Sequence, residues 1–172
     1  MKTFDDDPEP ASERGDTVSV GVSEYVVAAD GETLIAYGIG SCLAIVLFDP
    51  EANVGGLAQA VLPDRDHGEG EATGKFVDAA TDALLREMAE RGASVGRVEA
   101  RLAGGSEMID FEELETGIGD ANVAAARERL DAFDVPVVAT DTGGDYGRTV
   151  TFETATGDVT VRTVDHGTRE LS

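Results

Sequence analysis

The sequence is poor in cysteine and histidine, which excludes several kinds of site. The 172-residue chain has one cysteine, Cys42, and two histidines, His67 and His166. A single thiol cannot form an internal disulfide or a cysteine-based zinc site, and both histidines lie in polar surroundings. We therefore predict no metal site, and nothing in the sequence indicates another cofactor.

Positive charge is also scarce, since 13 Lys and Arg residues face 35 Asp and Glu residues, for a net charge of −22. Nucleic acids and anionic membranes repel such a chain, so neither is an expected partner. A halophilic cytoplasm would explain the acidity, because concentrated salt screens the self-repulsion. The alternative is an acidic patch with a function of its own.

Long apolar runs are absent too. No segment approaches the roughly 18 apolar residues of a membrane-spanning helix, so direct membrane insertion is not expected. Residues 1–16 lack the apolar stretch of a secretory signal, and a cytoplasmic location is predicted. Their Asp, Glu and Pro content indicates a disordered acidic N-terminal tail. We expect a single domain over residues 17–164 and a polar C-terminal tail over 165–172.

Alternating or continuous apolar patterns predict many short strands within this domain. These strands are expected near residues 17–22, 24–28, 33–37, 43–48, 55–63, 97–103, 135–139, 149–153 and 158–164. Apolar residues at helical spacing predict one helix over 75–91, ended by Gly92, and a second over 119–133. The predicted fold class is α+β, a layered sandwich of mixed β-sheets covered by two main helices. The strand order does not follow from these patterns.

The cysteine is the one candidate nucleophile. Cys42 follows Gly38 and Gly40 at the entry to an apolar strand. Glycines allow a sharp turn and the close approach of a substrate, and backbone N–H groups at such a turn can stabilise an oxyanion. A thiol placed there can attack a carbonyl carbon. The alternative is a buried structural cysteine that packs as a small apolar side chain.

Several motifs resemble one family in order along residues 18–164. Residues 38–50 read GIGSCLAIVLFDP, similar to the signature of the CheD family, chemoreceptor glutamine deamidases. Further blocks that resemble the family are GGLA at 55–58, LP at 62–63, KF at 75–76, AGGSEM at 103–108, IG with Asn122, DTGG at 141–144, Arg148 and TGDVTVR at 156–162.

This resemblance implies a fold, an activity and partners. Members of the CheD family convert glutamines of methyl-accepting chemotaxis receptors to glutamates in the cytoplasm, and they bind CheC, a phosphatase of the chemotaxis system. The family nucleophile corresponds to Cys42, which would form a thioester intermediate, with Gly40 and Ser41 in the substrate and oxyanion region. The implied fold is shared with toxins of the cytotoxic necrotizing factor type.

Three positions depart from the family pattern near the implied site. Gln59 stands where the family has its histidine base, Ala36 where a threonine is common, and Ala121 where an arginine is common. A neutral amide cannot take a proton from a thiol. His67, eight residues after Gln59, is a candidate substitute base. Two hypotheses therefore stay open: a deamidase that uses Cys42, and a weak or inactive binding module that regulates receptors or a CheC-type phosphatase.

Overall fold

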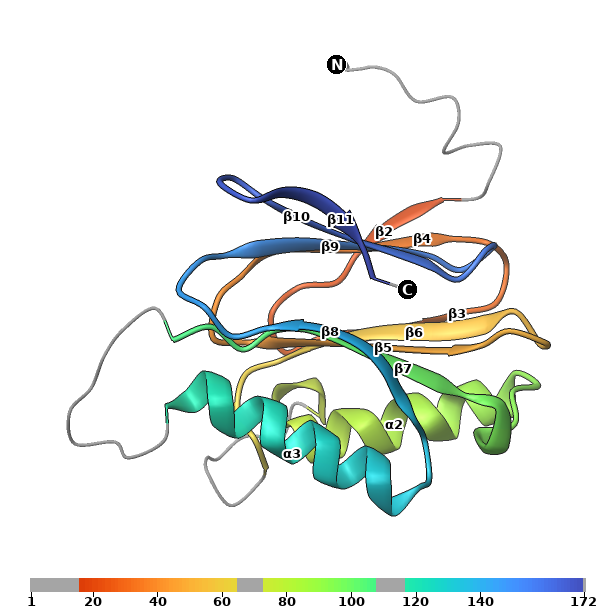
Figure 1. Cartoon of the computed structure of the whole chain (residues 1–172). Helices are drawn as coiled ribbons and strands as arrows, with labels where there is room; N and C mark the ends of the chain where they lie inside the picture. Colours follow the sequence, from red (N-terminus) through yellow and green to blue (C-terminus); the bar gives the residue numbers. More distant parts are fainter. Residues whose placement is uncertain (1–15, 65–72, 108–116, 172) are drawn as a thin grey trace.

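The fold has three layers, two of sheet and one of helix (Figure 1). The computed structural model describes residues 16–64, 73–107 and 117–171. An outer five-stranded sheet packs on a central five-stranded sheet, and two helices cover the other face of the central sheet. The predicted α+β class, with mixed sheets and two main helices, is confirmed. Within the described residues, no helix has both the length and the apolar character needed to cross a membrane.

The outer sheet has the strand order β11-β10-β9-β4-β2. Its strands are β2 (Thr17–Ser19), β4 (Thr33–Ile39), β9 (Arg148–Glu153), β10 (Asp158–Thr163) and β11 (Gly167–Glu170). Strand β2 runs parallel to β4, and the other neighbours are antiparallel.

Strand β11 lies in the segment that the sequence patterns assigned to a polar tail. It pairs with β10 over four residue pairs, from Thr160 and Glu170 to Thr163 and Gly167. The following Leu171 is buried, and its carbonyl accepts a hydrogen bond from Arg101. All four residues of β11 are exposed, so the strand shows no apolar alternation that could have predicted it.

The central sheet has the strand order β3-β6-β5-β7-β8. Its strands are β3 (Tyr25–Ala28), β5 (Leu43–Asp49), β6 (Val54–Ala60), β7 (Glu99–Gly104) and β8 (Val137–Thr142). Every residue of β5 is buried, because Ile45 and Leu47 face the helices while Val46 and Phe48 face the outer sheet. The continuous apolar run in the sequence reflects this two-sided burial.

The helices are α2 (Val77–Glu90) and α3 (Ile118–Ala132), with short 3-10 turns at Thr73–Lys75 and Val95–Arg97. Helix α2 buries its face of Val77, Ala80, Leu84 and Met88 against the central sheet. Helix α3 connects β7 to β8, which therefore run parallel.

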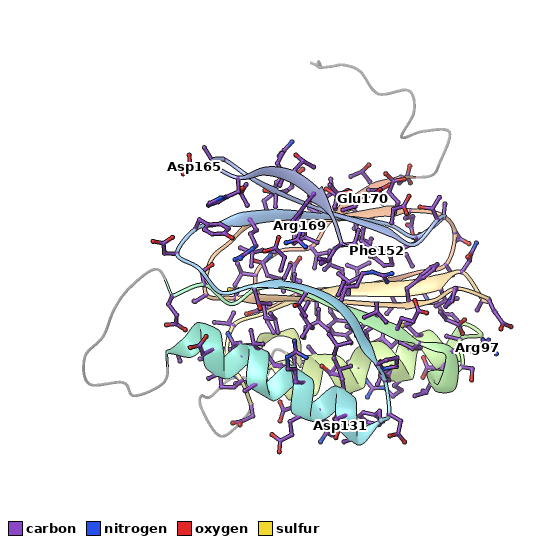
Figure 2. The ribbon with its side chains drawn as sticks, in the orientation of Figure 1. Arg97, Asp131, Phe152, Asp165, Arg169 and Glu170 are labelled. Carbon is purple, nitrogen blue, oxygen red and sulfur yellow. The ribbon has the colours of Figure 1, made fainter. Side chains whose placement is uncertain are left out.

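The two ends of the sandwich carry different groups. At one end, called here the cysteine end, lie the loops 20–24, 37–42, 104–107, 143–147 and 163–167. At the opposite end the buried Asp49 pairs with Arg97 at 3.0 Å. Figure 2 shows Asp165 and Arg97 at these opposite ends, with Phe152 between them in the layer between the sheets.

Candidate active site

Cys42 lies in the turn between β4 and β5. Its side chain is half-buried and packs against the apolar layer between the two sheets. Gly38 enters the turn with a φ of +59°, a left-handed conformation that side chains disfavour. Burial raises the pKa of the Cys42 thiol, and a backbone hydrogen bond at Cys42 offsets only part of that effect.

Three consecutive carbonyls of this turn accept hydrogen bonds from the segment that follows β7 and from helix α3. The backbone N–H of Ser106 donates to Gly40 at 3.0 Å, and that of Gly105 donates to Cys42 at 2.8 Å. The Nδ2 of Asn122 donates to the carbonyl of Ser41 at 3.0 Å. In a trans peptide the C=O and the following N–H point in opposite directions. The N–H groups of Ser41 and Cys42 are therefore directed away from these partners.

Gly104 allows the end of β7 to lie directly against the cysteine turn. Its φ is +111°, and a Cβ there would lie 2.6 Å from the carbonyl oxygen of Cys42 and 2.7 Å from a methyl group of Ile39. Both distances are far below van der Waals contact, so any side chain would displace the turn. The first glycine of the AGGSEM block thus has a direct geometric reason.

Asn122 joins the cysteine turn to the end of β6. Its side chain is fully buried, and its Nδ2 also donates to the carbonyl of Val61 at 3.0 Å. In the first turn of α3, the backbone N–H of Asp120 donates a hydrogen bond to the carboxylate of Glu107.

A buried arginine holds the segment that contacts the cysteine turn. The guanidinium of Arg148 donates to the Oγ of Ser106 at 3.0 Å and pairs with Asp141 at 3.1 Å. The Ser106 hydroxyl donates in turn to the carbonyl of Tyr146 at 2.6 Å. The network therefore ties the loop 143–147 to the segment 104–106. Asp141 lies in β8 as the counter-ion of this buried cation.

Gln59 lies on the same face of the central sheet as Cys42. It pairs with Ala44, and alternation along β5 puts the side chains of Ala44 and Cys42 on one face, towards the outer sheet. The amide of Gln59 is buried, and its Nε2 donates to the carbonyl of Val20 at 3.0 Å. Ala36 faces the same layer from the outer sheet. Positions 36, 42 and 59 therefore share one region.

The comparisons with known proteins agree on one family. The model described as "CheD chemotactic sensory transduction" matches residues 61–163. A protein named "Probable chemoreceptor glutamine deamidase CheD 2" from Geobacter metallireducens is 45% identical over 158 residues, which cover 90% of this chain and 98% of that protein. The chain belongs to the CheD family.

Two further CheD relatives come from other organisms. One from Haloarcula marismortui, named "Probable chemoreceptor glutamine deamidase CheD", is 38% identical over 96% of each chain. The "Chemoreceptor glutamine deamidase CheD" of Thermotoga maritima is 38% identical over 86% of this chain and 92% of its own. These alignments extend beyond the 61–163 segment and cover most of both chains.

The remaining candidate residues of this CheD protein fall in three different places. Ala121 is half-buried in the first turns of α3, beside Asn122. His67 lies outside the described residues. His166 is exposed at the cysteine end, where its ring lies 4.4 Å from that of Tyr146. The structure therefore brings positions 36, 42 and 59 together, with Gly40 and Ser41 in the turn itself.

The reactivity of Cys42 should depend steeply on pH. Its pKa is raised, so the thiolate fraction at neutral pH is small and should grow about tenfold for each pH unit below that pKa. We expect the alkylation rate of Cys42 by iodoacetamide to rise throughout pH 6–9 without levelling. The opposite result would be an alkylation rate that stays level between pH 6 and 8 in the wild type but rises with pH in His67→Ala. That result would identify His67 as a base.

Proposed function

We propose that this CheD protein deamidates glutamine side chains of chemoreceptors, with Cys42 as the nucleophile. The observation that carries this proposal is the turn of Gly40, Ser41 and Cys42. Its three carbonyls are held from one side by Ser106, Asn122 and Gly105, while the thiol reaches the edge of the apolar layer. Such a turn can present a nucleophile and N–H donors to the same carbonyl group.

The chemistry proceeds in two steps that together consume one water molecule. The Cys42 thiolate attacks the side-chain carbonyl carbon of glutamine, and the N–H groups of Ser41 and Cys42 face the oxyanion that forms. The C–N bond breaks, ammonia leaves with a proton from solvent, and a thioester remains. Water then attacks the thioester, which releases glutamate and restores the thiol. No redox partner or metal is needed for this balance.

The proton of Cys42 has no basic acceptor at position 59. The Gln59 amide is neutral and already donates to Val20. Unless His67 takes the proton, solvent must remove it, and the reaction should then be slow at neutral pH. A cysteine tolerates this loss better than a serine would, because a few per cent of an ordinary thiol is ionised near pH 7.

A second candidate function is a binding module with little or no chemistry. It is favoured by the amide of Gln59 in the place of the family base and by the raised pKa of Cys42. Such a module would act in the cytoplasm, where it would dock on chemoreceptors or on a CheC-type phosphatase. We also propose, from the family resemblance, that its fold is that of the cytotoxic necrotizing factor type of cysteine hydrolase.

Mass spectrometry of a chemoreceptor cytoplasmic fragment separates the two functions. Incubation with the wild type in high salt should add about 1 Da at particular glutamines, and Cys42→Ser should abolish this change. The same Cys42→Ser variant should bind the fragment with nearly the wild-type Kd, because the substitution keeps the size of the side chain. Absence of any conversion by the wild type, with binding intact, would support the binding module instead.

A further inference from the structure

Exposed apolar side chains gather around the cysteine end. Among the described residues, the large hydrophobic side chains with the greatest exposure are Val164 at 98%, Val22 at 60% and Tyr37 at 57%. All three lie at the cysteine end, in the 163–167 turn, the 20–24 loop and the end of β4. Scattered exposed valines need no explanation, but the three most exposed large apolar side chains fall at the end that carries the candidate nucleophile, as expected of a protein-binding surface.

A groove of about 570 Å³ opens between these elements. One of its walls is Gly38, four residues before Cys42, and the opposite wall is the turn that carries Val164. The full lining is Gly38, Tyr146, Gly147, Arg148, Thr149, Arg162, Thr163, Val164 and Asp165. Gly38 is the lining residue that belongs to the 37–42 loop, and Cys42 itself is not part of the lining.

The groove differs in charge from the rest of the chain. Its lining contains two arginines and one aspartate, whereas the whole chain has 13 basic and 35 acidic residues. Arg148 is neutralised by Asp141 beneath the groove. Arg162 is exposed and makes no ion pair within the described part of the chain. An acidic partner is repelled by a chain of this net charge, and it meets less repulsion at a groove whose lining is not acidic in balance.

We propose that this groove binds the chemoreceptor segment that flanks the target glutamine, with an acidic residue of that segment on Arg162 and an apolar residue on Val164. The inference rests on the proposed function and adds a substrate-docking surface to it. A protein glutamine reaches Cys42 only if its neighbours in the receptor lie across the cysteine end. The groove lies at the same end of the sandwich and offers the cation of Arg162 and the exposed aliphatic side chain of Val164, with Asp165 as its one acidic residue.

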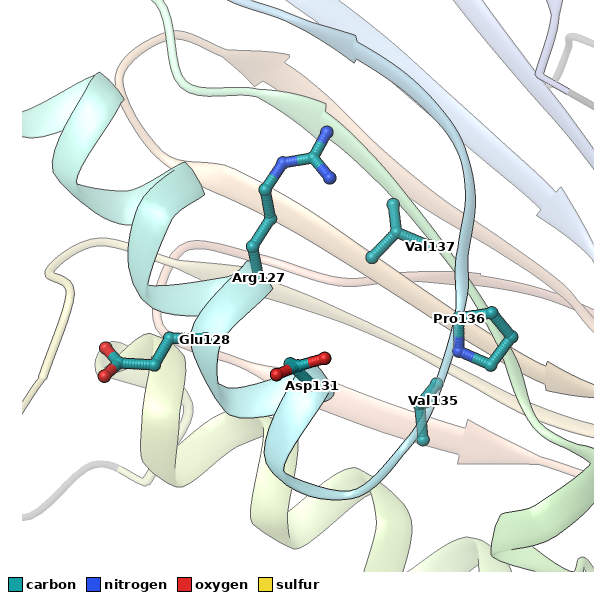
Figure 3. Close-up of a pocket in the computed structure, with 6 residues that line it drawn as sticks. All are labelled: Arg127, Glu128, Asp131, Val135, Pro136 and Val137. Atoms are coloured by element: carbon teal, nitrogen blue, oxygen red, sulfur yellow. The ribbon is translucent and has the colours of Figure 1, made fainter.

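A second groove provides matched control positions. It has a volume of about 460 Å³ and lies between α3 and β8, at the opposite end of β8 from Asp141. Figure 3 shows Arg127 and Val137 extending into the space between the helix and the strand. Arg127 is exposed, and Val138 next to this groove is 42% exposed. Arg127→Glu and Val138→Asp thus repeat the same chemical changes away from Cys42.

Binding of a chemoreceptor cytoplasmic fragment, measured by fluorescence anisotropy in the Cys42→Ser background, tests the proposal without requiring catalysis. Arg162→Glu and Val164→Asp should each raise the Kd roughly tenfold, as substitutions of central contact residues commonly do. Arg127→Glu and Val138→Asp should change it less than twofold. Equal effects at both grooves, no effect at either, or no binding by the parent protein would overturn the docking surface.

Salt separates the two contacts. At the lowest KCl concentration at which the parent protein stays folded, the Arg162→Glu effect should be largest, and in 3 M KCl it should nearly vanish, because salt screens exposed charges. The Val164→Asp effect should persist, since it removes an apolar contact. A fragment with lysines in place of the acidic residues beside the target glutamine should bind Arg162→Glu better than it binds the parent.

The docking proposal and the deamidase proposal can fail separately. Groove-dependent binding by a wild type that produces no glutamate would keep the docking surface and remove the enzyme. Glutamate formation that is insensitive to Arg162→Glu and Val164→Asp would keep the enzyme and remove the docking surface.

Discussion

Replacing Gln59 with histidine is expected to raise the deamidation rate about 100- to 10,000-fold at neutral pH, the usual contribution of a positioned general base. Position 59 shares a sheet face with Cys42, so an imidazole there can take the thiol proton and stabilise the thiolate. The carbonyl of Val20, which now accepts the Gln59 amide, can accept one ring N–H instead. That hydrogen bond would leave the other ring nitrogen as the acceptor.

The same substitution should change the pH profile. With Gln59 the rate follows the small thiolate fraction and rises with pH, whereas with histidine it should level near the pKa of the imidazole. Rates of glutamate formation on the receptor fragment, measured from pH 6 to 9 by mass spectrometry, would record both changes. Gln59→Asn is the matched control, because it is also buried and neutral and should give no gain.

A Gln59→His protein that folds but gains no activity would show that the missing base is not the only obstacle. Ala36 is the next position to restore, because it faces the same layer from the outer sheet. The double variant Ala36→Thr with Gln59→His would then test whether a hydroxyl is needed to orient the ring. No gain in the double variant would favour the binding module.

Removal of the buried guanidinium in Arg148→Met should lower the deamidation rate about 100-fold in protein that is still folded. Arg148 does not touch Cys42, and it acts by fixing Ser106, whose backbone N–H holds the carbonyl of Gly40. A shift of about 1 Å in a reacting group can cost such a factor. Arg148→Met also leaves Asp141 with only the exposed Arg169, at an expected cost of about 3 kcal/mol in unfolding free energy.

Arg97→Met is the control that separates positioning from stability. It breaks the ion pair with Asp49 at the opposite end of the sandwich. Burial by itself would raise the pKa of Asp49, but Arg97 and three backbone N–H groups lower it to about 2. This variant should lose stability in urea yet keep the wild-type alkylation rate of Cys42. If Arg97→Met lowers the deamidation rate as much as Arg148→Met does, then Arg148 has no positioning role.

The sequence by itself determined the local elements. Apolar residues at strand and helix spacing predicted nine of the ten described strands and both helices, because a side chain must face a core whatever its position in the fold. The single cysteine after two glycines indicated the candidate nucleophile. The motifs that follow one another in order along residues 18–164 indicated the family. Exposed β11 gave no such pattern, since it is held by backbone hydrogen bonds to β10 rather than by buried side chains.

Only the tertiary structure decided which distant residues meet. Asn122 lies 81 positions from Ser41, and Arg148 lies 42 positions from Ser106, yet each pair is joined by a hydrogen bond. Such contacts depend on the strand order and on the crossover through α3, which periodicity does not encode. Asp141 became the counter-ion of the buried Arg148. The groove beside Gly38 formed because separate segments of the chain end at one edge of the sandwich. Local preferences act over a few residues, whereas a site is assembled by packing across the whole chain.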